Sequence, residues 1–399
     1  MVSGMRSVVI VGASLAGVSA AKSLRRSGFD GAITLVGDEP HLPYQRPPLS
    51  KQFLSGEWDR ARIALRVPDN LGINWVLDAR AMSLDVARRE VALANGRRLP
   101  FDGLVIATGA RARKPRWYAE LPGVFTLRTL DDALAIQAHV RAGARRFAIV
   151  GAGFIGCESA ATLRAANCDV TLIDIDPLPM LRALGETLGR ISYKLHEAHG
   201  VQMAMGAAVE GFVGATKVQG VRLADGRIIE ADGVLVGVGV VPNVEWLQGS
   251  GIALDDGVVC DATGAVPGLD RIVAAGDVAR CTHPYYGAMR IEHWNSAIAQ
   301  GDTAARTLLA APGAAQANAA IPFFWSDQHG NKLQLVGAPS PADALRVVEG
   351  GFDEKRFVAL FERGDAATGA FLMNSPHRVA AHTAIVEEAA RGLAQETAS

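Results

Sequence analysis

Two glycine-rich hexapeptides are the parts of this sequence whose residue types and spacing most clearly suggest chemistry. Residues 12–17 read Gly-Ala-Ser-Leu-Ala-Gly, and residues 151–156 read Gly-Ala-Gly-Phe-Ile-Gly. Glycines at these spacings allow a tight turn from a strand into a helix, and they let backbone N–H groups approach a pyrophosphate. Ser14 replaces the middle glycine of the first hexapeptide but is also small. Each hexapeptide therefore predicts a site for one dinucleotide.

Acidic residues near the second hexapeptide indicate which nicotinamide dinucleotide it would bind. Asp174 lies near the end of the apolar segment 170–176. A carboxylate there accepts a hydrogen bond from the ribose 2′-hydroxyl and repels a 2′-phosphate, so NADH is favoured over NADPH. Glu158, expected in the first turn of the following helix, lies where a nicotinamide would meet a flavin and suits a paired lysine. The alternative explanations are a solvated strand-end charge for Asp174 and helix N-terminal stabilisation for Glu158.

Three further segments supply the parts that an FAD site needs around the first hexapeptide. Residues 104–110 form an apolar strand ending in the small pair Thr108 and Gly109, where backbone can lie close to a flavin nucleotide. Residues 272–279 deliver Asp277 at a strand end, where a carboxylate can bind a ribityl hydroxyl. The loop 43–51, PYQRPPLSK, places Arg46 and Lys51 beside an anionic cofactor. Together with the hexapeptide they favour FAD over an empty turn.

The same repeated unit positions both hexapeptides. An apolar strand, the glycine turn, an alanine-rich helix and a second strand ending near an acid occur first from Val8 and again from Phe147. The helices should reach about Arg26 and Ala166. Strands with apolar residues at nearly every position suit a parallel sheet that is covered on both faces. The pattern therefore predicts two doubly wound α/β domains.

Composition shifts along the chain suggest the domain boundaries. Crossovers are expected at 111–117 and near Pro242, and aromatic short strands begin at Ile321, after the alanine-rich loop 310–320. These features predict a third, smaller α+β domain. The expected division is an FAD domain at 1–112 and 243–318, an NAD domain at 113–242, and a C-terminal interface domain at 319–399.

Bulk properties exclude several functional classes. The formal net charge of 399 residues is −1, which gives no general attraction to nucleic acid. No apolar run approaches the roughly 18 residues that a membrane span needs, so we expect a cytoplasmic protein with no membrane partner. The cysteines lack CxxC spacing, which argues against a disulfide framework, a redox dithiol or a metal site and predicts buried apolar filler. They are Cys157, Cys168, Cys260 and Cys281.

The assembled motifs resemble the FAD-dependent NADH:ferredoxin reductases of oxygenase systems, the family of putidaredoxin reductase and the biphenyl dioxygenase ferredoxin reductase. The resemblance covers nearly the whole chain and rests on these segments in the family's order: VGDEPHLPYQRPPLSK, TLRTLDDA, GAGFIGCE, GVGVVPN, AAGDV, EHWNSAIAQG and PFFWSDQHGNKLQLVG. It implies a glutathione-reductase-like fold with two Rossmann-like dinucleotide-binding domains and a C-terminal α+β interface domain. Ser14, and Asp174 where many members have Glu, are mild departures.

The resemblance also implies site residues and a reaction. Electrons would pass from NADH through FAD, one at a time, to a [2Fe–2S] ferredoxin that serves a P450 or a Rieske dioxygenase. Lys51 would lie beside the flavin ring, Glu158 near the nicotinamide and Trp294 near the isoalloxazine, as the three catalytic residues. For Trp325, core packing is slightly favoured. The predicted cofactor-binding residues are Gly12, Ser14, Leu15, Ala16, Gly17, Asp38, Glu39, Arg46, Lys51, Ala81, Ala107, Thr108, Gly109, Arg128, Asp277, Glu292, His293, Trp294, Gly151, Gly153, Phe154, Ile155, Gly156, Glu158, Asp174, Gly237, Val238 and Gly239.

Two alternative functions share this architecture. One is an NADH-sensing, partner-binding flavoprotein that resembles apoptosis-inducing factor, and the other is a rubredoxin reductase. A flavin disulfide reductase is excluded because the loop 43–51 has no cysteine pair.

Overall fold

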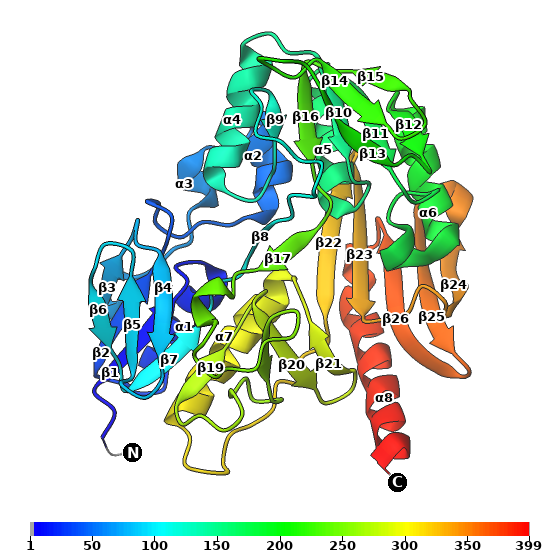
Figure 1. Ribbon diagram of the computed structural model, residues 1–399. Helices are drawn as coiled ribbons and strands as arrows, with labels where there is room; N and C mark the ends of the chain where they lie inside the picture. Colours follow the sequence, from blue (N-terminus) through cyan, green and yellow to red (C-terminus); the bar gives the residue numbers. More distant parts are fainter. Residues whose placement is uncertain (1–3, 399) are drawn as a thin grey trace.

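The computed structural model describes residues 4–398, and its N-terminal part is built on a five-stranded parallel sheet (Figure 1). The strand order is β19-β7-β1-β2-β3, and every neighbouring pair is parallel. Four of these strands, β1, β2, β3 and β7, come from the N-terminal part of the chain, whereas β19 is contributed by residues much later in the sequence. The strands are β1 (Ser7–Val11), β2 (Ala32–Val36), β3 (Ile73–Val76), β7 (Gly103–Ile106) and β19 (Ile272–Ala274).

Both faces of this sheet are buried, which explains its continuous apolar strands. Val8 and Ile10 of β1 pack toward the helices on one face, and Val9 and Val11 pack toward the three-stranded hairpin sheet on the other. Because successive side chains of a strand point to opposite faces, all four buried residues of β1, Val8 to Val11, need apolar side chains. The helices are α1 (Leu15–Arg26) and α7 (Trp294–Leu309), which contact each other, and the hairpin strands are β4 (Ala81–Asp85), β5 (Glu90–Leu93) and β6 (Arg98–Pro100).

A second parallel sheet repeats this design in the middle of the chain. Phe147 and Ile149 of β10 pack against helices, and Ala148 and Val150 pack against a second three-stranded antiparallel sheet. The expected repeated unit is therefore confirmed, with helices α1 and α5 in equivalent places. The sheet order is β12-β11-β10-β16-β9, with β9 (Val124–Phe125), β10 (Arg146–Val150), β11 (Asp169–Asp174), β12 (Gln202–Met205) and β16 (Gly233–Val236). The covering elements are α4 (Leu130–Arg141), α5 (Phe154–Ala165), α6 (Leu181–Ala198), β13 (Val209–Val213), β14 (Gly220–Leu223) and β15 (Ile228–Glu230).

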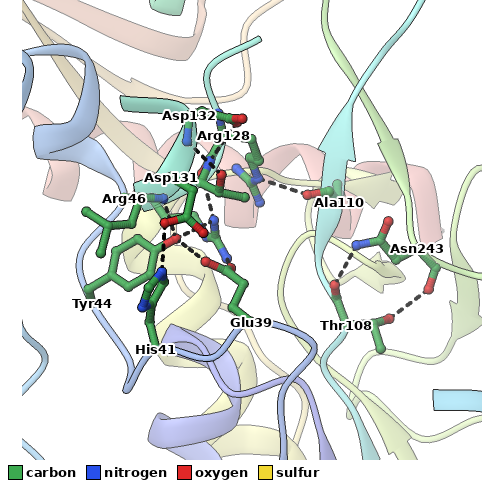
Figure 2. A network of polar contacts seen from close by, with 12 residues as sticks. Glu39, His41, Tyr44, Arg46, Thr108, Ala110, Arg128, Asp131, Asp132 and Asn243 are labelled. Carbon is green, nitrogen blue, oxygen red and sulfur yellow. Dashed lines mark hydrogen bonds and ion pairs between the residues drawn. The ribbon is translucent and has the colours of Figure 1, made fainter. Parts of the chain in front are cut away.

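The two crossovers between these parts pair with each other. β8 (Ala110–Ala112) runs antiparallel to β17 (Val240–Pro242). Beside them, Thr108 Oγ1 donates to the Asn243 carbonyl at 2.8 Å, and Asn243 Nδ2 donates to the Thr108 carbonyl at 2.9 Å (Figure 2). The chain thus leaves the first sheet and returns to it along two adjacent strands.

The C-terminal part is an antiparallel sheet with one long helix, as expected of a small α+β domain. Its order is β22-β23-β26-β25-β24. One face packs on α8 through Val336 and Leu372, and the other joins the core around α6 through Leu335 and Phe361. The elements are β22 (Phe323–Gln328), β23 (Asn331–Gly337), β24 (Ala344–Gly351), η4 (Phe352–Glu354), β25 (Arg356–Arg363), β26 (Ala366–Met373), η5 (Pro376–Arg378) and α8 (Val379–Ala398). No helix among residues 4–398 is long and apolar enough to cross a membrane.

Short elements complete the fold and bring two cysteines together. Cys260 of β18 lies opposite Cys281 of β20 in a parallel pair, with the Sγ atoms 3.3 Å apart. All four cysteines are free, and three are buried as expected, whereas Cys281 is partly exposed. The remaining elements are η1 (Pro47–Ser50), α2 (Gln52–Ser55), α3 (Arg60–Ile63), η2 (Asp69–Leu71), η3 (Glu245–Leu247), β18 (Val258–Cys260), β20 (Ala279–His283) and β21 (Gly287–Arg290).

Candidate functional site

The first glycine turn can be built only with glycine at its two ends. Gly12 has a φ of +128°, and a Cβ there would lie 1.9 Å from the carbonyl oxygen of Ala107. A Cβ on Gly17 would lie 2.1 Å from the carbonyl oxygen of Gly12. Ser14 is the N-cap of α1, but its side chain makes no capping hydrogen bond, and the first turn has no acid. The N–H groups of Leu15 and its neighbours therefore begin a helix with its positive end available to an anion.

The second glycine turn has the same design. Gly151 has a φ of +107°, and a Cβ there would lie 2.3 Å from the carbonyl oxygen of Gly237, while one on Gly156 would lie 1.8 Å from the Gly151 oxygen. A Cβ on Gly153 would meet nothing within 4 Å, so the turn is open toward solvent at this point. Phe154 and Ile155 then begin α5. The structure thus brings two of the predicted residues, Gly151 and Gly237, into contact.

Asp174 supports this turn directly. Its Oδ2 accepts a hydrogen bond from the Ala152 N–H at 2.5 Å, and its Oδ1 accepts one from the Asp176 N–H at 2.9 Å. It is therefore more than a solvated strand-end charge. A carboxylate has further lone pairs, so these bonds leave it able to accept a ligand hydroxyl. Asp176 pairs with Arg182 at 2.7 Å.

Charged side chains from three separate segments meet at the edge of the first sheet, and Figure 2 shows part of this network. Arg46 donates to Glu39 Oε1 at 2.6 Å and to the Arg128 carbonyl at 2.6 Å, and Arg128 pairs with Asp277. Tyr44, which sequence reasoning missed, donates to Glu39 and accepts from the Leu130 N–H at 2.9 Å. Burial raises the pKa of Tyr44, so its hydroxyl stays protonated. The network fixes Arg128 and Asp277 beside the first glycine turn.

Other predicted residues have different surroundings. Glu39 is used within this network, whereas Asp38 is exposed and has no hydrogen-bond partner in the described chain. Glu292 is exposed and pairs with Arg290 at 2.7 Å. Ala81 begins β4 of the hairpin sheet. These positions remain predictions, with Asp38 the acid that is free to bind a ligand.

Lys51 and Glu158 form a buried ion pair between the two halves of the site. Lys51 Nζ lies 3.0 Å from Glu158 Oε2, and the two residues are 8% and 3% exposed. Lys51 follows η1, and Glu158 is the fifth residue of α5 rather than part of its first turn, because the helix already begins at Phe154. Ser50 also donates to Oε2 and Ser326 donates to Oε1 at 2.7 Å. Neither serine was identified from the sequence, and simple helix N-terminal stabilisation is excluded for Glu158.

Aromatic side chains of α7 and β22 contact each other. Trp294 begins α7 and lies edge-on to the half-buried Trp325, with the centroids 6.1 Å apart, so the expected core packing of Trp325 holds only in part. Trp294 Nε1 and His293 Nδ1 are buried with no hydrogen-bond partner in the described residues. Burial lowers the pKa of His293 to about 4, against the opposing charge of Asp277. A neutral imidazole and an indole N–H therefore remain available to a polar ligand edge.

Comparisons with known proteins place this geometry in a family. Residues 6–301 match the family described as pyridine nucleotide-disulphide oxidoreductase, and residues 323–398 match the family described as reductase C-terminal. The chain belongs to the pyridine nucleotide-disulphide oxidoreductases.

Several relatives of this oxidoreductase are similar over most of their length. Rhodocoxin reductase of Rhodococcus erythropolis is 38% identical over 376 residues, which cover 93% of this chain and 87% of that protein. The ferredoxin–NAD(+) reductase component of the p-cumate 2,3-dioxygenase system of Pseudomonas putida is 38% identical over 382 residues, covering 94% and 91%. The crystal structure of the covalent putidaredoxin reductase–putidaredoxin complex matches with a TM-score of 0.90 and 33% identity, covering 96% of this chain and 93% of that chain.

The residues of the oxidoreductase fit the two cofactors of such a reductase, FAD and NAD(H). Each glycine turn presents the N-terminus of a helix of 12 residues without a capping side chain, which is the arrangement that a dinucleotide pyrophosphate requires. The unpartnered Trp294 N–H and His293 nitrogen provide hydrogen-bonding groups for a heterocycle. The fit therefore rests on backbone geometry and on unsatisfied buried atoms.

Proposed function

We propose that this oxidoreductase transfers electrons from NADH, through FAD bound at the first glycine turn, to a [2Fe–2S] ferredoxin that serves an oxygenase. The observation that carries the proposal is the Lys51–Glu158 ion pair, which joins the loop after η1 to the helix that follows the second glycine turn. A buried cation held between two dinucleotide turns is suited to electron transfer between their ligands, since it stabilises negative charge that develops there.

The chain's own residues would have distinct roles in this reaction. When bound, FAD supplies the chemistry that accepts two electrons as hydride and releases them singly. The N-terminus of α1 would bind the FAD pyrophosphate, and Asp277, fixed by Arg128, would accept a ribityl hydroxyl. The Lys51 ammonium would neutralise charge beside the ring, and Glu158 would hold that ammonium in place. Trp294 and His293 would contact the heterocycle.

The second turn would bind NADH in preference to NADPH. Asp174 would accept the ribose 2′-hydroxyl, and its charge would repel a 2′-phosphate. Arg182, the nearest cation along the chain, already pairs with Asp176 at 2.7 Å and is therefore engaged. We further propose the division into 1–112 with 243–318, 113–242 and 319–399, and a cytoplasmic location.

One experiment tests cofactor, donor and acceptor in sequence. Separate samples of the purified yellow protein are titrated anaerobically with NADH and with NADPH while flavin absorbance is recorded. The protein reduced by NADH is then mixed with purified [2Fe–2S] ferredoxins. We expect bleaching by NADH at stoichiometric amounts, reduction of ferredoxin, and rapid cytochrome c reduction only when ferredoxin is added. A colourless protein that cannot be reconstituted with flavin would overturn the proposal. Turnover with rubredoxin alone, or a stable reduced form that reduces no acceptor, would instead favour a rubredoxin reductase or an NADH sensor.

A further inference from the structure

A hydrogen-bonded chain of buried side chains reaches Glu158 from the C-terminal domain. Ser326 Oγ lies 2.7 Å from Glu158 Oε1, and Gln328 Nε2 lies 3.0 Å from Ser326 Oγ. Ser326 and Gln328 are 0% and 1% exposed. They are two residues apart on β22, so both side chains point to the same face of the strand, together with Phe324, which packs on Phe154 of α5 at 4.3 Å. The register of β22 therefore aims polar side chains at a buried carboxylate.

The hydrogen-bonded chain continues into two histidines, of which His196 is buried and His329 is partly buried. His196 of α6 places Nε2 at 3.2 Å from Gln328 Oε1, and His329 places Nε2 at 3.0 Å from His196 Nδ1. Burial lowers the pKa of His196 to about 4 and that of His329 to about 3. Both imidazoles are thus neutral near pH 7, and each has one donor and one acceptor nitrogen.

The direction of every hydrogen bond in the chain follows from the carboxylate. Glu158 can only accept, so the single Ser326 proton points to Glu158 and Ser326 must accept from the Gln328 amide nitrogen. Gln328 Oε1 then accepts from His196 Nε2–H, and His196 Nδ1 accepts from His329. All donors therefore point toward Glu158. A neutral amide does not pass on a proton. The row of hydrogen bonds therefore orients the Glu158 carboxylate and does not conduct protons.

Glu158 Oε1 has one hydrogen-bond donor in the described chain, Ser326, whereas Oε2 has Ser50 and Lys51. Cys157, on the same helix, is a further titratable group near the carboxylate, since burial and the charge of Glu158 raise the pKa of its thiol. Its thiol donates to the Ala152 carbonyl at 3.4 Å and not to Oε1. The orientation of the carboxylate, and with it that of the ammonium, depends on the C-terminal domain through one hydroxyl.

We propose that Ser326 and Gln328 are positioning residues for NADH oxidation, holding the Glu158 carboxylate so that it fixes the Lys51 ammonium at the flavin. The inference rests on the proposed function. It goes beyond that function by giving the C-terminal domain a part in the step that reduces the flavin, in addition to any contact with the electron acceptor.

The test compares Ser326→Ala with the rescue variant Ser326→Thr, which keeps the hydroxyl. Ser23→Ala is the matched control, because Ser23 is also a buried serine that donates to a carboxylate, Asp302 Oδ1 at 2.7 Å, but between α1 and α7. Anaerobic stopped-flow reduction of the flavin is measured over a range of NADH concentrations between pH 6 and 9. We expect Ser326→Ala to lower the limiting rate about tenfold, with the NADH dissociation constant within twofold of the parent. Ser326→Thr should recover most of the rate, and Ser23→Ala should retain it.

A second readout does not depend on activity. Ser326→Ala leaves Glu158 Oε1 without a donor in the described chain, whereas Ser23→Ala leaves Asp302 Oδ1 paired with Arg26. Because an unsatisfied buried acceptor is destabilising, Ser326→Ala should be less stable than Ser23→Ala in urea unfolding of the full-length protein. Ser326→Thr should recover that stability, which general damage to the fold would not allow.

The outcomes separate the two proposals. If NADH fails to reduce the flavin of the parent protein, the proposed function fails. If the parent is reduced but Ser326→Ala matches it at every pH, or loses no more than Ser23→Ala, the positioning role is wrong. If Ser326→Ala does not fold, Gln328→Met is the second variant that tests the positioning role. We expect it to lower the limiting rate about threefold, and an unchanged rate would overturn the role of Gln328.

Discussion

Replacing Lys51 by methionine tests the buried ion pair on which the proposed reaction depends. Lys51 Nζ is 3.0 Å from Glu158 Oε2, and both side chains are almost fully buried. At an effective dielectric constant of about 20, two unit charges at this separation attract each other by about 5.5 kcal/mol. Desolvation offsets much of that attraction, but removing one partner leaves a buried charge uncompensated, which typically costs about 3–5 kcal/mol.

The structure places the expected loss at the lower end of this range. Ser50 and Ser326 would still donate to the Glu158 carboxylate in Lys51→Met. We therefore expect a decrease of about 3 kcal/mol in the free energy of unfolding. The double variant Lys51→Met/Glu158→Gln should recover most of it, because no unpaired charge remains. The rate of flavin reduction by NADH should fall about 100-fold, equivalent to about 2.7 kcal/mol of lost charge stabilisation in the transition state.

Urea unfolding and anaerobic stopped-flow absorbance measure these two effects. Lys332→Met is the matched control, since Lys332 also pairs with a carboxylate, Asp327 at 2.6 Å, but is 41% exposed. A surface pair of this kind contributes less than about 1 kcal/mol. If Lys51→Met is no less stable than Lys332→Met, or if the single losses at Lys51 and Glu158 simply add in the double variant, the reasoning about the buried pair is refuted. An unchanged rate of flavin reduction would remove Lys51 from the mechanism.

Three further outcomes follow from other parts of the structure. Gly156→Ala should weaken NADH binding at least tenfold in a fluorescence titration while flavin content is unchanged, because its Cβ would lie 1.8 Å from the Gly151 oxygen; unchanged affinity would contradict the assigned turn. Diamide should oxidise Cys260 and Cys281 to a disulfide and lower the number of free thiols, counted in denaturant, by two. Cys281→Ser should prevent disulfide formation, and a parent protein that keeps four free thiols would show that the two sulfur atoms cannot reach bonding distance. The folded-state pKa of His196 is lowered to about 4, below its unfolded value of about 6.5, so its contribution to stability is complete above pH 6.5 and is lost as the pH falls toward 4. Urea unfolding should show this loss, less steeply in His196→Gln, and equal slopes would contradict it.

Local patterns in the sequence were sufficient to predict the two parallel sheets. The apolar runs at Val8 and Phe147, each followed by a glycine turn, specify strand, turn and helix within about 20 consecutive residues, and the structure confirms both units. The pairing of Lys51 with Glu158 was also predictable. The helix after the second turn carries the acidic Glu158, and the loop 43–51 ends in a lysine that can pair with it.

The contacts that were missed depend on how distant segments pack. Ser326 reaches Glu158 across 168 residues, and Tyr44 reaches Leu130 across 86. No local spacing distinguishes these residues from ordinary polar neighbours. Cys260 and Cys281 meet only because their strands are parallel and in register, which a search for CxxC spacing does not detect. The position of Glu158 was misjudged since α5 begins at Phe154, before the last glycine of the turn.

The pairing of β8 with β17 has an evolutionary and practical consequence. Residues 113–239 leave and rejoin the first sheet through two strands that are hydrogen-bonded side by side, so the cut ends of this segment would be neighbours. Such a segment can be exchanged as a cassette if the incoming segment keeps Arg128 and Glu158, which pair with Asp277 and Lys51 of the host. Grafting the equivalent cassette from an NADPH-specific relative between Ala112 and Val240 is therefore a direct route to altered coenzyme choice, with the first glycine turn left in place.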